Sequence, residues 1–318
     1  MSYLEKKQIN GKVYVYFVKK ISFMKKLFVI NKHIGIDSPT INKEKFLLDN
    51  IDILSNEEFE FRETFLNQVK KDISHNQNLP DKIETNVIRI NNFTEGKRCQ
   101  KLLDGEFAKE FIFNSNNIEG SKITPEKVRE IIDKGDTKYK DRNEIKEVQN
   151  SILAFEYLKK SFKFNIASIK RLYYILTKDL VREGNQPYSR GFKKEPNVVG
   201  NSTTAPPEKV EAELINLIKW YRQNKYKIHP LILAFEFHRR YEFIHPFLDG
   251  NGRTGRMLMN KILMSNSYSP IIIYKENKLA YFNAIEKSKE GKLKAYYQLM
   301  LEQADKSYDY LLDVIKRY

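Results

Sequence analysis

The segment HPFLDGNGRTGR, residues 245–256, concentrates side chains that could do chemistry. His245 can act as a general base close to neutral pH. Asp249 offers a hard carboxylate of the kind that binds Mg²⁺ together with phosphate oxygens. Arg253 and Arg256 are three residues apart, so on a helix they share a face and could clamp anionic groups. This set of residues fits the transfer of a phosphate-containing group.

The glycines of the same segment predict a backbone anion site. Gly250 and Gly252 permit a sharp turn whose N–H groups converge at the start of the next helix. The run GNGRTG also matches the dinucleotide-binding pattern G-x-G-x-x-G, but that pattern requires a preceding strand. Residues 231–244 instead have the apolar spacing of a helix, and no GKS or GKT follows as in a P-loop. We therefore expect a helix, a turn that binds an anion, and a second helix.

The elements that must position this turn are mostly helical. Residues 13–18 and 27–35 read as two strands of a hairpin, and apolar residues recur at helical spacing over 45–73. Residues 74–90 read as a loop or linker and the best domain boundary. Residues 190–207 predict a short hairpin on a loop. The remaining expected helices are 105–120, 124–133, 143–162, 165–181, 206–224, 229–244, 252–266 and 292–318.

Composition bounds the class of protein. Hydrophobic residues make up 41% of the 318 residues, which is enough for a substantial core. No stretch reaches the ~20 apolar residues of a membrane span, so no membrane partner is expected. No signal peptide is recognisable, and the single cysteine, Cys99, excludes an internal disulfide, so we expect a cytoplasmic protein.

The net charge of +15 is concentrated at the N-terminus, where residues 1–46 hold ten lysines and three acidic residues. This charge favours an anionic partner. One alternative is a nucleic-acid-binding region in which Tyr14, Tyr16, Phe17 and Phe23 stack on bases. The same residues also fit a small sheet packed on the helical domain, which is the preferred interpretation.

Residues 245–256 resemble the signature of Fic-domain enzymes, H-P-F-x-[DE]-G-N-G-R-x-x-R, at every defined position. The resemblance extends over about residues 95–300. It implies a mainly α fold: a Fic (Fido) helical core over 95–318 with an inhibitory helix (105–120), a β-hairpin flap (190–207) and the catalytic loop (245–256). Residues 1–75 would form a preceding strand-and-helix region, and residues 76–94 a linker.

The resemblance implies a protein adenylyltransferase, which moves AMP from ATP to a Tyr, Ser or Thr hydroxyl of a target protein. His245 would deprotonate the hydroxyl, Asp249 would hold Mg²⁺, and Phe247 would anchor the loop. The backbone at Asn251 and Gly252, with the Asn251 side chain, would form the α-phosphate site. The implied nucleotide-binding residues are Gly250, Asn251, Gly252, Arg253, Thr254, Gly255, Arg256, Tyr281 and Phe282.

Two further segments have roles implied by the resemblance. A flap would pair with an extended target segment by strand addition; its residues are Val198, Val199, Gly200, Asn201 and Ser202. Tyr281 and Phe282 would line the adenine pocket, although Lys289 stands where relatives often carry Asn.

The segment SNNIEG, residues 115–120, resembles the inhibitory motif [ST]-x-x-x-E-[GN] through Ser115, Glu119 and Gly120. The motif implies that Glu119 pairs with Arg256 and removes the partner of the γ-phosphate, so resting activity should be low. Alternatives within the fold are removal of AMP, with Glu119 positioning water, and transfer of another phosphate-containing group. Self-modification and a homodimer also stay open.

Overall fold

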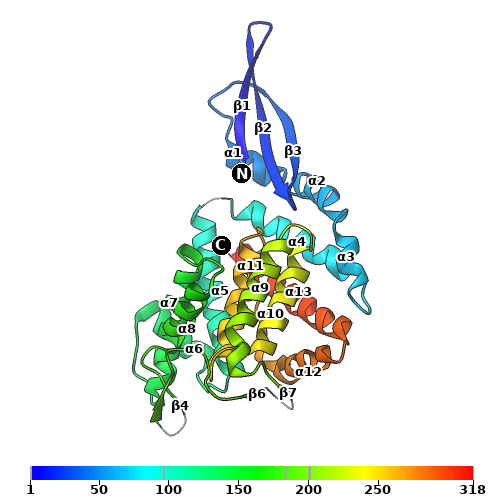
Figure 1. The fold of residues 1–318 in the computed structure, drawn as a ribbon. Helices are drawn as coiled ribbons and strands as arrows, with labels where there is room; N and C mark the ends of the chain where they lie inside the picture. Colours follow the sequence, from blue (N-terminus) through cyan, green and yellow to red (C-terminus); the bar gives the residue numbers. More distant parts are fainter. Residues whose placement is uncertain (1, 96, 183–184, 200–201, 318) are drawn as a thin grey trace.

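The computed structural model describes residues 2–95, 97–182, 185–199 and 202–317. It consists of a mainly helical body with a small antiparallel sheet that projects from one end (Figure 1). This arrangement confirms the expected fold class, a helical core preceded by a β-containing segment. No helix in the described ranges is long and apolar enough to cross a membrane.

The projecting sheet has three strands in the order β1 (Ser2–Ile9), β2 (Lys12–Phe23) and β3 (Lys26–Ile36). Asn10 and Gly11, with φ of 49° and 77°, make the two-residue turn that joins β1 to β2. One face of the sheet, including Phe17, packs on α1 (Lys43–Asp49) and α2 (Ile51–Glu63). The sheet is therefore longer than the predicted hairpin, and β1 was missed.

The predicted linker at 76–94 is wrong, because most of it forms α4 (Leu79–Phe93). Ile83, Val87 and Ile90 are buried and follow helical spacing, while Pro80 lies in the first turn, where the missing N–H has no cost. α4 follows α3 (Leu66–Lys71) and packs against α2 and α13 (Leu293–Arg317). It joins the N-terminal region to the body instead of separating them.

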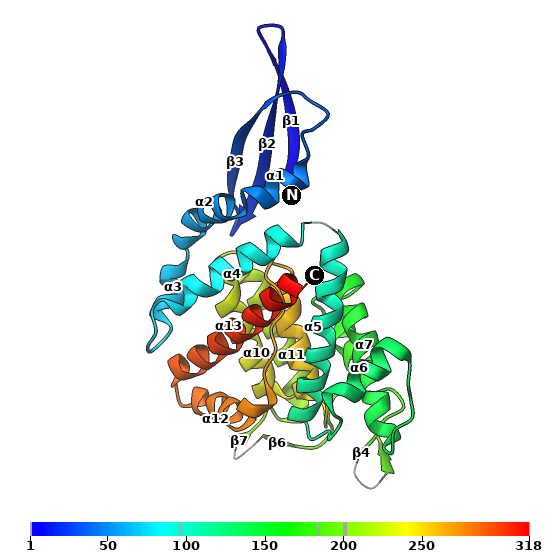
Figure 2. The same ribbon diagram turned by 180° about the vertical axis from the view of Figure 1, so that it is seen from behind.

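The body surrounds α10 (Pro230–Ile244), whose residues Leu231, Leu233, Phe235 and Phe237 are fully buried (Figure 2). Its helices match the predicted ones within a few residues, except that α5 begins earlier and α12 was not expected. The other helices are α5 (Lys97–Ile118), α6 (Pro125–Lys134), α7 (Arg142–Lys160), α8 (Ile166–Thr177), η2 (Pro207–Lys209), α9 (Val210–Asn224), α11 (Asn251–Met264), η3 (Lys275–Asn277) and α12 (Lys278–Lys289).

Two short hairpins lie on one side of the body. The first pairs β4 (Val181–Arg182) with β5 (Gln186–Pro187). The second pairs β6 (Val198–Val199) with β7 (Ser202–Thr203), which confirms the hairpin expected within residues 190–207. Gly200 and Asn201 of the predicted flap lie outside the described residues.

A buried polar network joins the sheet to the body. The ammonium of Lys19 on β2 bonds Glu58 on α2 at 2.6 Å, and Glu58 also pairs with Arg62 at 2.6 Å. Arg62 reaches Glu84 on α4 at 2.9 Å, and Glu84 accepts a 2.5 Å hydrogen bond from the hydroxyl of Tyr268. The chain of contacts thus runs from β2 to the segment that follows α11.

Candidate active site

The turn between α10 and α11 carries the predicted catalytic residues. His245 caps α10 in the left-handed region, with φ 48° and ψ 63°, and Gly250 precedes α11 with φ 77°. A Cβ at Gly250 would also lie 3.2 Å from Thr177 and 3.4 Å from the ring of Tyr173. Both the backbone angle and the close packing therefore require glycine at this position.

The loop is braced from inside by Phe247 and Asn251. Phe247 is fully buried and its ring stacks on Tyr173 at 3.7 Å, which confirms the predicted anchor. The side chain of Asn251 accepts the N–H of Phe247 and donates to its carbonyl, both at 2.8 Å. The amide oxygen and one N–H of Asn251 therefore close the loop, and the contact of this residue with phosphate stays a prediction.

The two arginines of the segment are buried and each is paired with a carboxylate from another helix. Arg253 bonds Glu147 on α7 at 2.7 Å and the hydroxyl of Tyr188 at 3.2 Å. Arg256 bonds Glu119 at 2.7 Å, and it also reaches the side-chain and carbonyl oxygens of Ser115 at 3.0 and 2.9 Å. The predicted pairing of Glu119 with Arg256 is therefore present.

Glu119 occupies the predicted anion site itself. Its Oε1 lies 2.3 Å from where a Cβ of Gly252 would stand, directly at the N-terminal turn of α11. A helix N-terminus favours negative charge, so the carboxylate sits where a phosphate oxygen would be stabilised. Arg253 Nε and Arg256 Nη1 are buried without hydrogen-bond partners among the described residues. Such unused N–H donors are expected where an anion can bind.

The charge state of the two arginines is secure. Burial acts to lower the pKa of Arg256, but Glu119, Tyr281 and Glu242 together outweigh burial and the pKa rises. Burial also raises the pKa of the Glu147 carboxyl, which Arg253 only partly offsets. Glu147 is not recognisable from the sequence, because it is one of several acidic residues on a helix and nothing local marks it.

A buried carboxylate lies beside His245, the predicted catalytic base. Nδ1 of His245 is 3.6 Å from Glu242 on α10, and Glu242 is 3.7 Å from Nδ1 of His238. Burial alone would raise the pKa of Glu242, but the two histidines lower it overall, with a contribution from Arg256. Glu242 can therefore orient the imidazole so that the other ring nitrogen accepts a proton. Its position three residues before His245, on the same helix, is the sequence signal from which this contact could have been predicted.

Four of the predicted nucleotide-binding residues differ widely in how deeply they are buried. Thr254 is fully buried and its hydroxyl bonds the carbonyl of Gly250 at 2.9 Å. A Cβ at Gly255 would lie 2.4 Å from Glu242, so this glycine serves the contact of α10 with α11. Both residues therefore take part in the packing around α11, and their contact with a nucleotide stays a prediction. Tyr281 is buried and bonds His238 at 2.7 Å, whereas Phe282 is 37% exposed; their contact with adenine stays a prediction.

Asp249 is the candidate ligand for Mg²⁺. It is partly exposed and accepts the N–H of Gly250. No group of three or more His, Cys, Asp and Glu residues that could hold a metal occurs in the part of the chain that the structure describes. A single carboxylate fits a cation that arrives bound to a nucleotide, because Mg²⁺ is commonly held by one or two carboxylates plus phosphate oxygens.

The flap lies against the catalytic loop. The side-chain amide of Asn197, next to β6, donates to the carbonyl of Phe247 at 2.9 Å, and the N–H of Ala205 donates to the carbonyl of Phe243 at 3.1 Å. Val198 is 63% exposed. Lys289 on α12 donates to the carbonyl of Thr203 at 3.1 Å, so it adjoins the flap.

The N-terminal aromatic residues are divided between the two faces of the sheet. Phe17 and Phe23 are buried, so they cannot stack on bases as the nucleic-acid alternative required. Tyr14 and Tyr16 pack around the exposed ring of His33 at 5.6 and 5.2 Å. The nucleic-acid alternative is therefore wrong for Phe17 and Phe23. Stacking of bases on Tyr14 and Tyr16 stays a prediction.

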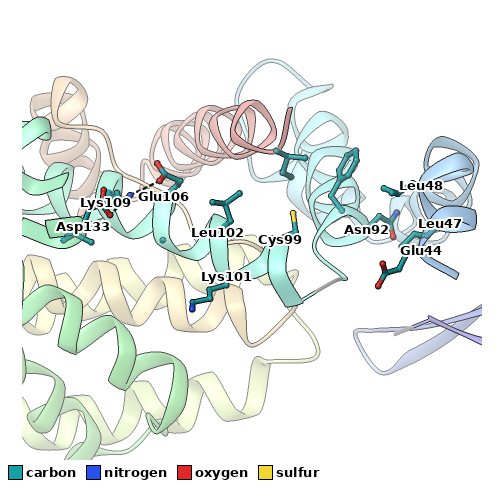
Figure 3. A pocket seen from close by; sticks show the side chains of 14 residues that line it. Glu44, Leu47, Leu48, Asn92, Cys99, Lys101, Leu102, Glu106, Lys109 and Asp133 are labelled. Atoms are coloured by element: carbon teal, nitrogen blue, oxygen red, sulfur yellow. Dashed lines mark hydrogen bonds and ion pairs between the residues drawn. The ribbon is translucent and has the colours of Figure 1, made fainter. Parts of the chain in front are cut away.

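A pocket of about 1000 Å³ lies away from these residues, between α1, the ends of α4 and α13, and α5 (Figure 3). Leu47, Leu48 and Leu102 line it, Cys99 faces it, and Lys109 is paired with Glu106 at its far end. None of the residues from 245 to 256 borders it.

The segment that contains this site is similar to known proteins. Residues 163–263 match the model of the Fic/DOC family. The chain is 27% identical over 209 residues to the proteins named protein adenylyltransferase Fic of Drosophila mojavensis and Drosophila melanogaster. The match covers 63% of this chain and only 40% and 41% of these relatives.

Solved structures share the fold. A Fic-domain-containing signaling protein from Bacteroides thetaiotaomicron aligns with a TM-score of 0.66 at 22% identity, over 74% of this chain and 97% of that one. Fic-1 (aa134–508) from C. elegans aligns with a TM-score of 0.61 at 21% identity, over 73% of this chain and 69% of that one. The family match over residues 163–263, the relatives and the common fold support a Fic (Fido) protein.

Proposed function

We propose that this chain is a protein adenylyltransferase that transfers AMP from ATP to a Tyr, Ser or Thr hydroxyl of a target protein. The observation that carries the proposal is the cradle at the start of α11. Two buried arginines and the backbone of Gly252, against which the Glu119 carboxylate lies, come together there, in the segment that begins with His245. Cationic groups and N–H donors fixed in advance stabilise the charge that develops during phosphoryl chemistry.

His245 would take the proton of the target hydroxyl. The hydroxyl oxygen would form a bond to the α-phosphorus, and the bond from that phosphorus to its bridging oxygen would break, releasing pyrophosphate. Arg253 and Arg256 would hold the departing phosphates. Mg²⁺ held at Asp249 would neutralise part of the phosphate charge. The target segment would pair with the flap, so that its hydroxyl reaches His245.

Glu119 would act as an internal brake. Its carboxylate pairs with Arg256 and lies against Gly252, so a triphosphate cannot occupy the same space. A charge-assisted hydrogen bond of this kind contributes about 1.5–3 kcal/mol. Activity would rise only when the end of α5 moves and Glu119 leaves the site.

Removal of AMP is a second candidate, supported by the position of the same carboxylate. The side chain of Glu119 is 25% exposed, so it is within reach of water as well as of Arg256. A carboxylate so placed could orient a water toward an AMP-modified side chain.

The test uses Mg²⁺, ATP labelled on the α-phosphate, and three forms of the chain: wild type, Glu119→Gly, and Glu119→Gly with His245→Ala. We expect label on protein, including self-modification, only with the single variant. Labelling from γ-labelled ATP or another nucleotide alone would reassign the reaction. Release of AMP from a pre-labelled protein by wild type, but not by Glu119→Gly, would favour the second candidate.

A further inference from the structure

Lys193 has no role in the proposal above, yet it is one of the most buried charged side chains of the body. It lies between β5 and β6 and is 3% exposed. Its ammonium donates to Asn197 Oδ1 at 2.7 Å, to Thr204 Oγ1 at 2.6 Å and to the carbonyl of Ile244 at 3.2 Å. All three N–H donors of the ammonium are thus used.

The three acceptors come from different parts of the site. Asn197 directly precedes β6 and Thr204 directly follows β7, so they are the two legs of the flap. Ile244 is the last residue of α10, next to His245. The backbone N–H of Lys193 also donates to the carbonyl of Pro246 at 2.9 Å. Lys193 therefore contacts both legs of the flap and both neighbours of His245 in the chain.

The surroundings of this ammonium are neutral. The three acceptors are an amide, a hydroxyl and a carbonyl, and burial lowers the pKa of Lys193 to about 8. A buried cation without a carboxylate is costly, so an uncharged residue that only filled this space would be less expensive. What a lysine adds is three donors that radiate from one atom.

We propose that Lys193 is a positioning residue that fixes the flap against the catalytic loop, so that a target hydroxyl paired with the flap reaches His245. The proposal rests on the proposed function, because it assigns the flap the binding of the target. The proposal assigns the binding of the nucleotide and the placement of the target hydroxyl to different residues. The cradle of α11 would hold the nucleotide, and Lys193 would set where the acceptor lies relative to it.

Lys193→Met removes the donors and keeps most of the volume, Lys193→Arg keeps a cation, and Thr204→Val removes one acceptor. The matched control is Lys194→Met, since Lys194 is the exposed neighbour with the same charge. Each change is placed in the Glu119→Gly variant. Far-ultraviolet circular dichroism and thermal melting establish that each variant is folded.

We measure binding of Mg²⁺–ATP, the rate of self-labelling from α-labelled ATP, and hydrogen exchange of the amides near the flap. We expect Lys193→Met to lower the labelling rate by about tenfold. Binding of Mg²⁺–ATP should stay within about twofold, and Ala205, Lys193 and the amides next to them should exchange faster. Lys193→Arg should label faster than Lys193→Met but more slowly than the Glu119→Gly parent. Thr204→Val should lower the labelling rate less than Lys193→Met does. Lys194→Met should label at the rate of the parent.

The proposal is overturned if exchange at the flap is unchanged in Lys193→Met, or if nucleotide binding falls in parallel with labelling. Should the Glu119→Gly parent itself take no label, the proposed function fails, and hydrogen exchange alone then decides whether Lys193 fixes the flap. A Lys193→Met chain that does not fold leaves Thr204→Val to answer the same question, with faster exchange at Ala205 in support and unchanged exchange against.

Discussion

The two arginines of the catalytic segment are held by carboxylates in very different backbone settings. Both ion pairs measure 2.7 Å. Glu147 lies inside α7, where helical hydrogen bonds fix its position. Glu119 follows the last residue of α5 and precedes Gly120, whose φ is 111°. The side chain of Glu119 is also the more exposed of the two, at 25% against 14% for Glu147.

This difference indicates that the Arg253–Glu147 pair is a fixed part of the core, whereas the Arg256–Glu119 pair could open. Moving Glu147 away from Arg253 would require unwinding or displacing a helix of the core. Moving Glu119 requires only a change in the turn after α5, where its N–H donates to the carbonyl of Asn116 at 3.0 Å. Identical chemistry therefore yields a fixed support at Arg253 and a candidate switch at Arg256.

The largest expected effect comes from Glu119→Gln, which keeps the size of the side chain and removes its charge. Loss of a charge-assisted pair of about 1.5–3 kcal/mol should raise initial α-label incorporation by roughly 10–100-fold. Glu119→Asp, which keeps the charge on a shorter chain, should gain much less. Equal gains from both would show that packing, and not charge, holds the brake.

Glu147→Gln should act in the opposite direction. In the Glu119→Gly variant we expect labelling to fall by about tenfold, because Arg253 would lose the carboxylate that orients it. The free energy of unfolding should fall by about 2 kcal/mol, less than the 3–5 kcal/mol of fully buried pairs. Urea unfolding gives this value, and Glu156→Gln, on the exposed side of α7, is the control. An increase in labelling would make Glu147 a second brake.

The smallest effect is expected from Gly120→Ala. Its backbone angle disfavours a side chain by about 1–2 kcal/mol, although nothing blocks a Cβ there. The strain should shift the turn that carries Glu119 and raise labelling a few-fold. Gly135→Ala, which ends α6 with φ 66°, bears a similar strain away from the site and should leave labelling unchanged. Similar gains from both changes would contradict a local effect at Glu119.

Local sequence information was sufficient where short-range patterns determine structure. The helices of the body and the turn at 245–256 follow from apolar spacing, caps and glycines, and Thr124 caps α6 as its sequence indicates. The error at α4 arose because Pro80 and several polar residues hid the spacing of Ile83, Val87 and Ile90. The strand β1 was missed although the Asn10–Gly11 pair is a strong hairpin signal.

The partners of the site residues were harder to predict. Glu147 meets Arg253 across 106 residues of sequence, and only the packing of α7 on α11 brings them together. The side chain of Asn251 could face either a ligand or its own loop, and both choices fit the same sequence. Glu119 was found because its spacing from Ser115 and Gly120 is a recognisable motif, whereas Glu147 and Lys193 stand in no such pattern.

The polar network between the sheet and the body also bears on how the molecule melts. Without Arg62, Glu84 would remain fully buried with Tyr268 but without its counter-charge. A chain shortened to begin after residue 75 would leave that carboxylate in an apolar interior, where ionisation is expensive. We therefore expect the sheet and the helices to unfold together in one calorimetric transition, so that the N-terminal region is part of the folding unit and not an appendage to it.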